Sequence, residues 1–152
     1  MDKSKSVTET IEMTMSLLVM YWKRFFEKAM EKYSIRTVTT GAVLYSAYLH
    51  EGIVQDELGR ILNMDKAYIT RELNKLSELG YIVRDKDEND RRKNHIIVTE
   101  KGKKVAEAIG QCREEWITAE LSGITDGEQE VFLQILTKMV GNIQANFFGD
   151  EG

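Results

Sequence analysis

Most of this sequence consists of segments in which apolar residues recur every three or four positions. That spacing places the apolar side chains on one face of an α-helix. Ile69, Leu73 and Leu76 are one example. Six segments show the pattern and are predicted to be helices: residues 7–33, 39–49, 55–62, 66–79, 103–121 and 128–148.

The ends of these segments carry the residues that start and stop helices. Asp65 is placed to be the N-cap of the segment 66–79, and Gly80 follows its end. Gly59 stands where two short crossing helices would need a small residue. Other candidate N-caps are Thr37 or Thr39, and Thr125 or Asp126.

Two short segments, residues 81–84 and 95–99, are predicted to be β-strands because their pattern has a period of two. The ten residues between them, 85–94, contain no apolar side chain. We therefore predict a β-hairpin with a charged tip. The expected fold class is mainly α with this small hairpin, an α+β arrangement.

The central segments supply a small core of their own, and the terminal helices carry more apolar residues than one thin layer needs. We therefore expect the terminal helices to bury surface against a second copy in a C2 dimer. The alternative is that these stripes are simply the core of one chain. The residues expected in the central core are Leu58, Ile61, Leu62, Ile69, Leu73, Leu76, Ile82 and Ile97.

Composition is that of one soluble globular domain, with 152 residues, 42% apolar and 30% charged. There is no proline, and a single cysteine, Cys112, suits a reducing cytoplasm. The longest apolar run, Leu17–Trp22, is far short of the roughly 20 residues of a membrane helix. We expect a cytoplasmic protein that is neither secreted nor membrane-bound.

The charge distribution is uneven. The chain has a net charge of −4, but residues 55–104 hold 12 Lys and Arg against 10 Asp and Glu, a net of +2. A local basic stripe rather than the overall charge determines affinity for phosphates. The alternative is an ordinary solvated charged surface.

Two short helices joined by a tight turn and followed by a hairpin form a winged helix-turn-helix, which fits duplex DNA. The second helix suits the major groove. Arg71 could pair with guanine, Thr70 and Tyr68 could contact a base edge, a methyl group or phosphate, and lysines suit phosphates. A plain solvated face is the alternative. The outward residues are Lys66, Ala67, Tyr68, Thr70, Arg71, Asn74 and Lys75.

The stretch Glu57 to Gly102 resembles the MarR (multiple antibiotic resistance regulator) family of transcription factors. The resemblance rests on an ordered series of short motifs, and the flanking helices match the family in length and order. The motifs are Glu57-Leu58-Gly59, Thr70-Arg71, Leu76 with Gly80, Val83-Arg84, Asp90 with Arg92, and Val98-Thr99 with Gly102.

The resemblance implies roles for the hairpin tip. Asp90 would hold Arg92 by an ion pair, and Arg92 would enter the minor groove, where a guanidinium suits the narrow electronegative space. Arg91 and Lys93 would lie on flanking phosphates.

At the base of the hairpin, Arg84 has two interpretations. It would be either a phosphate contact or an ion-pair partner of Asp87 or Asp85.

The family commonly binds a small aromatic or anionic effector between its dimerisation helices and its winged domain. Plain core aromatics are the alternative interpretation of the candidate residues. The candidates are Trp22, Phe26, Tyr45 and Tyr48, with Arg36 or His50 as a polar partner.

No catalytic or metal-binding pattern is present. His50 and His95 lie far apart in the sequence, and Cys112 lies on an apolar helix stripe with no CxxC partner. We therefore predict no enzyme activity, no cofactor and no metal.

The sequence thus predicts a homodimeric winged helix-turn-helix regulator, with a DNA-binding domain of residues 37–102 and a dimerisation region of residues 1–36 and 103–152. We expect an effector-responsive repressor of a pseudo-palindromic operator. The alternatives are a winged helix used for protein contact, an activator without an effector, and an enzyme.

Overall fold

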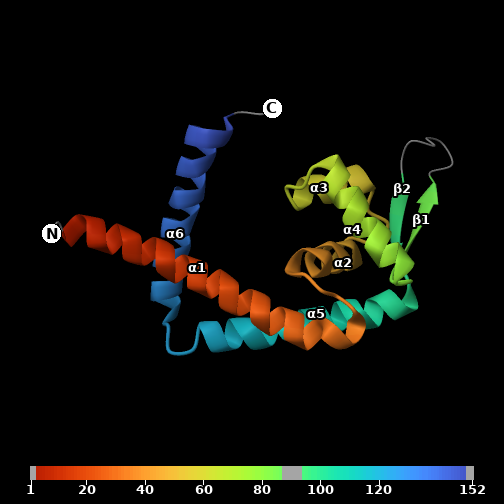
Figure 1. Cartoon of the computed structure of the whole chain (residues 1–152), viewed down its shortest axis with the longest axis horizontal. Coiled ribbons are helices and arrows are strands. Elements are labelled where there is room, and N and C mark those ends of the chain that lie inside the picture. The colour runs from red at the N-terminus through yellow and green to blue at the C-terminus, as the bar shows by residue number, and fades with distance from the viewer. Residues whose placement is uncertain (1–2, 87–93, 150–152) are drawn as a thin grey trace. The chain divides into compact units, whose positions relative to one another are not determined.

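The computed structural model describes residues 3–86 and 94–149, and only the backbone of residues 3–6. The described residues are mainly helical with one β-hairpin (Figure 1), which confirms the predicted fold class. The elements are α1 (Lys3–Met30), the 3-10 turn η1 (Glu31–Tyr33), α2 (Val38–Leu49), α3 (Gln55–Ile61), α4 (Lys66–Glu78), β1 (Ile82–Lys86), β2 (Asn94–Val98), α5 (Glu100–Glu120), α6 (Asp126–Ile143) and the π-helical turn η2 (Gln144–Phe148).

Helix α5 begins three residues earlier than the sequence predicts. Thr99 starts the helix, because its Oγ1 accepts a hydrogen bond from the amide of Gly102 at 3.0 Å. Gly102 therefore belongs to the first turn. A Cβ atom at this position would overlap the carbonyl oxygen of Tyr81, so the glycine is needed for close packing.

The chain divides into two compact units, residues 1–114 and 115–152. In the first unit, α2, α3, α4 and the hairpin share one hydrophobic core with Phe26 and Met30 of α1 and with Val105 and Ile109 of α5. The core is closely packed where α1 meets α2, since a Cβ on Gly41 would overlap the ring of Phe26.

The register of the hairpin corrects part of the predicted core. Ile82 pairs with Val98 and Arg84 pairs with Ile96, so these four residues share the face of the hairpin that contains the buried Ile82 and Ile96. Ile97 lies on the opposite face and is 38% exposed, so its predicted place in the core is wrong.

Ile61 is also misplaced in the predicted core, because it lies at the end of α3 and is 49% exposed. Leu62 packs against the core while remaining partly exposed. The other predicted members are buried: Leu58, Ile69, Leu73, Leu76 and Ile82.

Several hydrogen bonds fix the hairpin, and Tyr81 just before it, to the rest of the unit. The amide of Ile96 donates to the carbonyl of Ile53 at 2.9 Å, which ties β2 to the segment just before α3. The hydroxyl of Tyr81 donates to the carbonyl of Tyr33 at 2.7 Å. Burial, and to a lesser degree the neighbouring Tyr33, raise the pKa of Tyr81 above its ordinary value.

The second unit contains the end of α5 and all of α6. Thr125 is the N-cap of α6, in a reciprocal capping box with Glu128. No residue of α6 is buried, although many of its residues are apolar. Within the described ranges, no helix is long and apolar enough to cross a membrane.

Candidate nucleic-acid interface

Helix α4 is held against α3 by a tight turn. Asn63 adopts a left-handed conformation (φ 50°), and the amide of Met64 donates to the carbonyl of Gly59 at 2.8 Å. A Cβ on Gly59 would lie 3.2 Å from the carbonyl oxygen of Met64, as expected for a position that needs a small residue. Asp65 is the N-cap of α4, and its Oδ1 accepts from the amide of Tyr68 at 2.7 Å.

The two faces of α4 are as predicted. Ile69, Leu73 and Leu76 are fully buried. On the other side, Tyr68 and Thr70 are half-buried and the remaining predicted residues are exposed. The exposed residues are Lys66, Ala67, Arg71, Asn74 and Lys75.

Arg71 has a defined environment on this outer face. Its guanidinium lies over the ring of Tyr68, 5.2 Å from the centroid. Stacking on an aromatic ring restricts a flexible arginine without occupying its hydrogen-bond donors. Tyr68 thus orients Arg71 while leaving it able to bind.

Glu72, which was not among the residues predicted from the sequence, is only 3% exposed at the junction of α4 and α2. The Oγ1 of Thr40 donates to Glu72 Oε2 at 2.6 Å, and Lys75 Nζ donates to Glu72 Oε1 at 2.7 Å. A buried carboxylate requires such partners. Position 72 lies three residues after Ile69 and four before Leu76, so the spacing of the apolar stripe was the signal that it faces inward.

Lys75 is therefore not a free cation. It remains half exposed, but its ammonium is paired with the buried carboxylate of Glu72.

The predicted wing-tip residues Asp90, Arg91, Arg92 and Lys93 lie outside the described residues. Where the hairpin is described, its register runs from Ile82–Val98 to Lys86–Asn94. At its base, Arg84 Nη2 donates to the carbonyl of Thr70 at 3.3 Å. Asp87, one proposed partner of Arg84, also lies outside the described residues.

The aromatic candidates for the effector site lie in two ring pairs. Phe26 is buried beneath Trp22, with ring centroids 5.4 Å apart, and Tyr45 lies beside Tyr48 at 6.4 Å. Arg36 is exposed and lines a separate hollow together with Glu27, Glu31 and Ser34.

The residues considered for chemistry have ordinary structural surroundings. Cys112 is buried in the core. The Nδ1 of His50 lies 2.9 Å from the carbonyl of Ser46, and the Nδ1 of His95 lies 2.8 Å from that of Gly52. Among the described residues, no group of three His, Cys, Asp or Glu side chains is placed to hold a metal ion.

A helix-turn-helix with a basic outer face and an adjoining hairpin defines the winged helix-turn-helix class. The sequence model of the MarR family matches residues 37–93. A relative from Bacillus subtilis (strain 168), named as the uncharacterized HTH-type transcriptional regulator YybA, is 30% identical over 112 residues, or 72% of this chain and 75% of its own length.

Solved structures agree with this result. The crystal structure of a MarR transcriptional regulator from Methanosarcina mazei Go1 is 31% identical, with a TM-score of 0.73 over 88% of this chain and 96% of that one. A Staphylococcus aureus MepR–DNA complex has the same fold, with a TM-score of 0.80, 24% identity and coverage of 86% of this chain and 96% of that chain.

The chain belongs to the MarR family of transcriptional regulators. The family predicted from the sequence motifs is thereby confirmed. Since this is a family of regulators, the prediction that the chain is not an enzyme is confirmed as well.

Proposed function

We propose that this chain binds duplex DNA as a homodimer, with α4 in the major groove. The observation that carries the proposal is the basic outer face of α4, presented on a helix-turn-helix beside a hairpin. An α-helix fits a groove about 12 Å wide, and its N-terminal side chains reach base edges. The Staphylococcus aureus MepR structure, which is a complex with DNA, supports the same use of the fold.

Within this proposal, Arg71 makes the principal base contact. A guanidinium can donate two hydrogen bonds to the O6 and N7 atoms of guanine, and the ring of Tyr68 already orients it. Lys66, at the first turn of α4, lies on a phosphate. Ala67 and Asn74 complete the groove-facing surface, and the wing residues Asp90, Arg91, Arg92 and Lys93 retain their predicted roles at the minor groove and its phosphates.

The test is fluorescence anisotropy with a pool of random duplexes, titrated at several salt concentrations. We expect affinity to fall steeply with salt, because each neutralised phosphate contributes about −0.9 to the slope of log K against log salt. Arg71→Ala and Arg92→Ala should each weaken binding. The matched control is Lys104→Ala, which removes an exposed charge of α5. Binding that is insensitive to salt and to both arginines would favour a winged helix used for protein contact.

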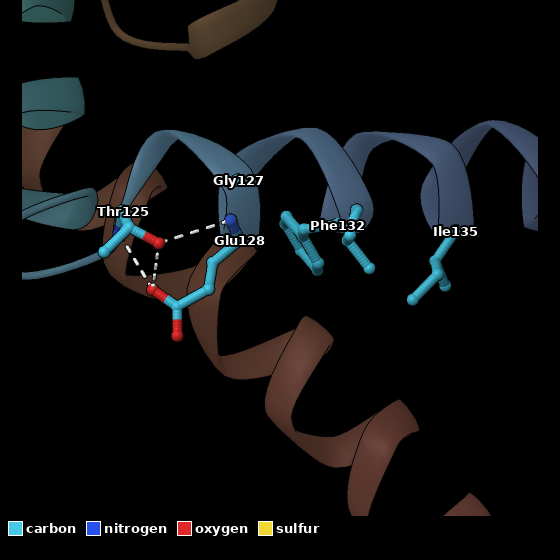
Figure 2. A pocket seen from close by; sticks show the side chains of 6 residues that line it. Thr125, Gly127, Glu128, Phe132 and Ile135 are labelled. Carbon is cyan, nitrogen blue, oxygen red and sulfur yellow. Dashed lines mark hydrogen bonds between the residues drawn. The ribbon is translucent and has the colours of Figure 1, made fainter.

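The dimer part of the proposal rests on exposed apolar surface in each unit. In α6, Val131, Phe132 and Ile135 are each about half exposed and line an apolar hollow beside the capping box (Figure 2). Along α1, Ile11 and Leu18 are among the exposed apolar residues. Large apolar surfaces of this kind mark association sites, and a C2 partner presents the same surface in return.

The dimer is tested with Phe132→Asp and, as a control, Gln134→Asp on the polar side of α6. We expect the first variant to be a monomer by sedimentation equilibrium and to bind an enriched duplex at least 100-fold more weakly. The second should remain a dimer. A monomeric wild-type chain with full DNA affinity would contradict the dimer.

The DNA-binding domain would then be residues 37–102, with residues 1–36 and 103–152 serving dimerisation. Two α4 helices should contact half-sites about one helical turn apart. The repressor role and the effector site at Trp22, Phe26, Arg36, Tyr45 and Tyr48 stay predictions.

A further inference from the structure

Thr70 lies where three elements of the winged helix-turn-helix meet. Its hydroxyl accepts a hydrogen bond from Gln55 Nε2 of α3 at 2.8 Å. The same hydroxyl donates to the carbonyl of Lys66, one turn earlier in α4, at 2.6 Å. Its backbone carbonyl accepts from Arg84 Nη2 of β1 at 3.3 Å. We call Gln55, Thr70 and Arg84 the Thr70 junction.

These hydrogen bonds use most of the hydrogen-bonding capacity of the Thr70 hydroxyl. A hydroxyl carries one proton and two lone pairs. The hydroxyl proton is donated to the carbonyl of Lys66, and one lone pair accepts the hydrogen bond from Gln55. Thr70 therefore has no proton left for an acceptor on a base edge or a phosphate. Gln55, which is itself buried, uses one of its two amide N–H donors on the same bond.

Arg84 is placed to act inward rather than outward. The hairpin register puts it opposite Ile96, on the face that contains the buried Ile82. Its Nε atom is buried and has no hydrogen-bond partner within the described part of the chain. The side chain as a whole is partly exposed, and its Nη2 is used on the carbonyl of Thr70. Asp85 follows on the opposite face of the strand, because side chains alternate.

We infer that Gln55 and Arg84 are positioning residues, which set the place of α4 relative to α3 and β1 through Thr70. The inference rests on the proposed DNA binding and replaces the interpretation of Arg84 as a phosphate contact. Base contacts by Arg71 depend on where α4 sits in the groove, whereas phosphate attraction depends mainly on charge. Loosening the junction therefore reduces discrimination between sequences and leaves the salt dependence unchanged.

The experiment uses two duplexes of equal composition: one enriched from a random pool by the wild-type chain, and its shuffled counterpart. The affinity ratio and the salt slope are measured for wild type, Gln55→Leu, Thr70→Val and Arg84→Lys. Arg84→Lys keeps the charge but not the fork of donors. We expect each variant to lose about tenfold or more in the ratio with an unchanged slope. Thr70→Ser, which keeps the hydroxyl, should keep the wild-type affinity ratio, and so should Lys104→Ala.

Two results would overturn the inference. Arg84 is a phosphate contact if Arg84→Lys keeps the ratio while Arg84→Ala lowers the magnitude of the slope by about one. Thr70 contacts a base itself if Thr70→Val lowers the ratio while Gln55→Leu does not. Thermal unfolding of each variant confirms that it is folded at the assay temperature.

A measurement on the free chain separates failure of this inference from failure of the proposed function. The Nε–H of Arg84 should exchange with water more slowly in ¹⁵N spectra than that of the exposed Arg36, because it is buried. If the wild-type chain binds no duplex, the proposed function fails and this exchange still tests the junction. Equal exchange rates for Arg84 and Arg36 would refute the buried geometry.

Discussion

Helices α4 and α6 contain similar alternations of apolar and polar residues, but they differ in what one chain buries. In α4, Ile69, Glu72, Leu73 and Leu76 are buried, and the outward residues are polar except for Ala67. In α6 no residue is buried, and apolar residues such as Phe132 remain outside. The surface of α4 is therefore complete within one chain and free to bind a polar ligand, whereas the apolar side chains of α6 stay exposed.

The largest effect that tests this difference between α4 and α6 is the loss of stability when a core side chain of α4 is removed. Leu73 is 0% exposed, so Leu73→Ala should lower the free energy of unfolding by about 2–5 kcal/mol. Urea titration followed by circular dichroism measures the loss, which should be the same at every chain concentration. The control is Leu49→Ala, where the leucine is 57% exposed and the expected change is within about 0.5 kcal/mol. A loss below about 1 kcal/mol at Leu73 would contradict a core complete in one chain.

The next largest loss of stability is expected from breaking the buried polar contact between Thr40 of α2 and Glu72 of α4. Thr40→Val keeps the shape of the side chain but leaves Glu72 Oε2 without its donor. Leaving a buried acceptor unsatisfied costs about 1–3 kcal/mol, so we expect a loss of that size in the same titration.

Two further variants test whether this loss comes from the contact itself. Thr39→Val, on the neighbouring partly exposed position, should change stability much less. A double-mutant cycle with Glu72→Gln should show coupling between the two positions. Additive effects would show that the two side chains do not interact.

Much of the fold followed from the sequence because helix periodicity and N-caps are local properties. The buried stripe of Ile69, Leu73 and Leu76 and the cap at Asp65 were both predicted from spacing. The errors arose where a neighbouring element decides the outcome. Ile96 rather than Ile97 is buried because of the register with β1, which a run of three apolar residues does not specify.

The same limit applies to the candidate site. The outer face of α4 was predictable from spacing for residues such as Arg71 and Asn74, but Glu72, which also lies between core positions, points inward. The partners of Thr70, Glu72 and Arg84 were not predictable, because they come from residues up to 32 positions away in the sequence. These tertiary contacts determine which polar residues are free to bind DNA and which hold the helix in place.

A smaller loss of stability is expected when the N-cap side chain of either helix is removed. Asp65→Ala in α4 and Thr125→Ala in α6 each remove a side chain that accepts a hydrogen bond from a backbone amide in the first turn. Such caps contribute about 1 kcal/mol. Hydrogen exchange of the first-turn amides should accelerate in each variant, in its own helix only. Faster exchange in both helices after one substitution would show that the two regions unfold together.

The smallest expected effect is the pH dependence of the α6 cap. Hydrogen bonds from the amide and then the hydroxyl of Thr125 lower the pKa of Glu128 below its ordinary value of 4.5. Because the folded-state pKa is the lower one, this stabilisation is fully present above the ordinary pKa and is lost as the pH falls through the lowered value. Exchange of the first-turn amides of α6, corrected for intrinsic pH dependence, should therefore accelerate on acidification. Glu128→Gln can form the same capping box without a titrating group, so its corrected exchange should not show this change. An identical pH response in both proteins would mean that Glu128 does not act through its charge.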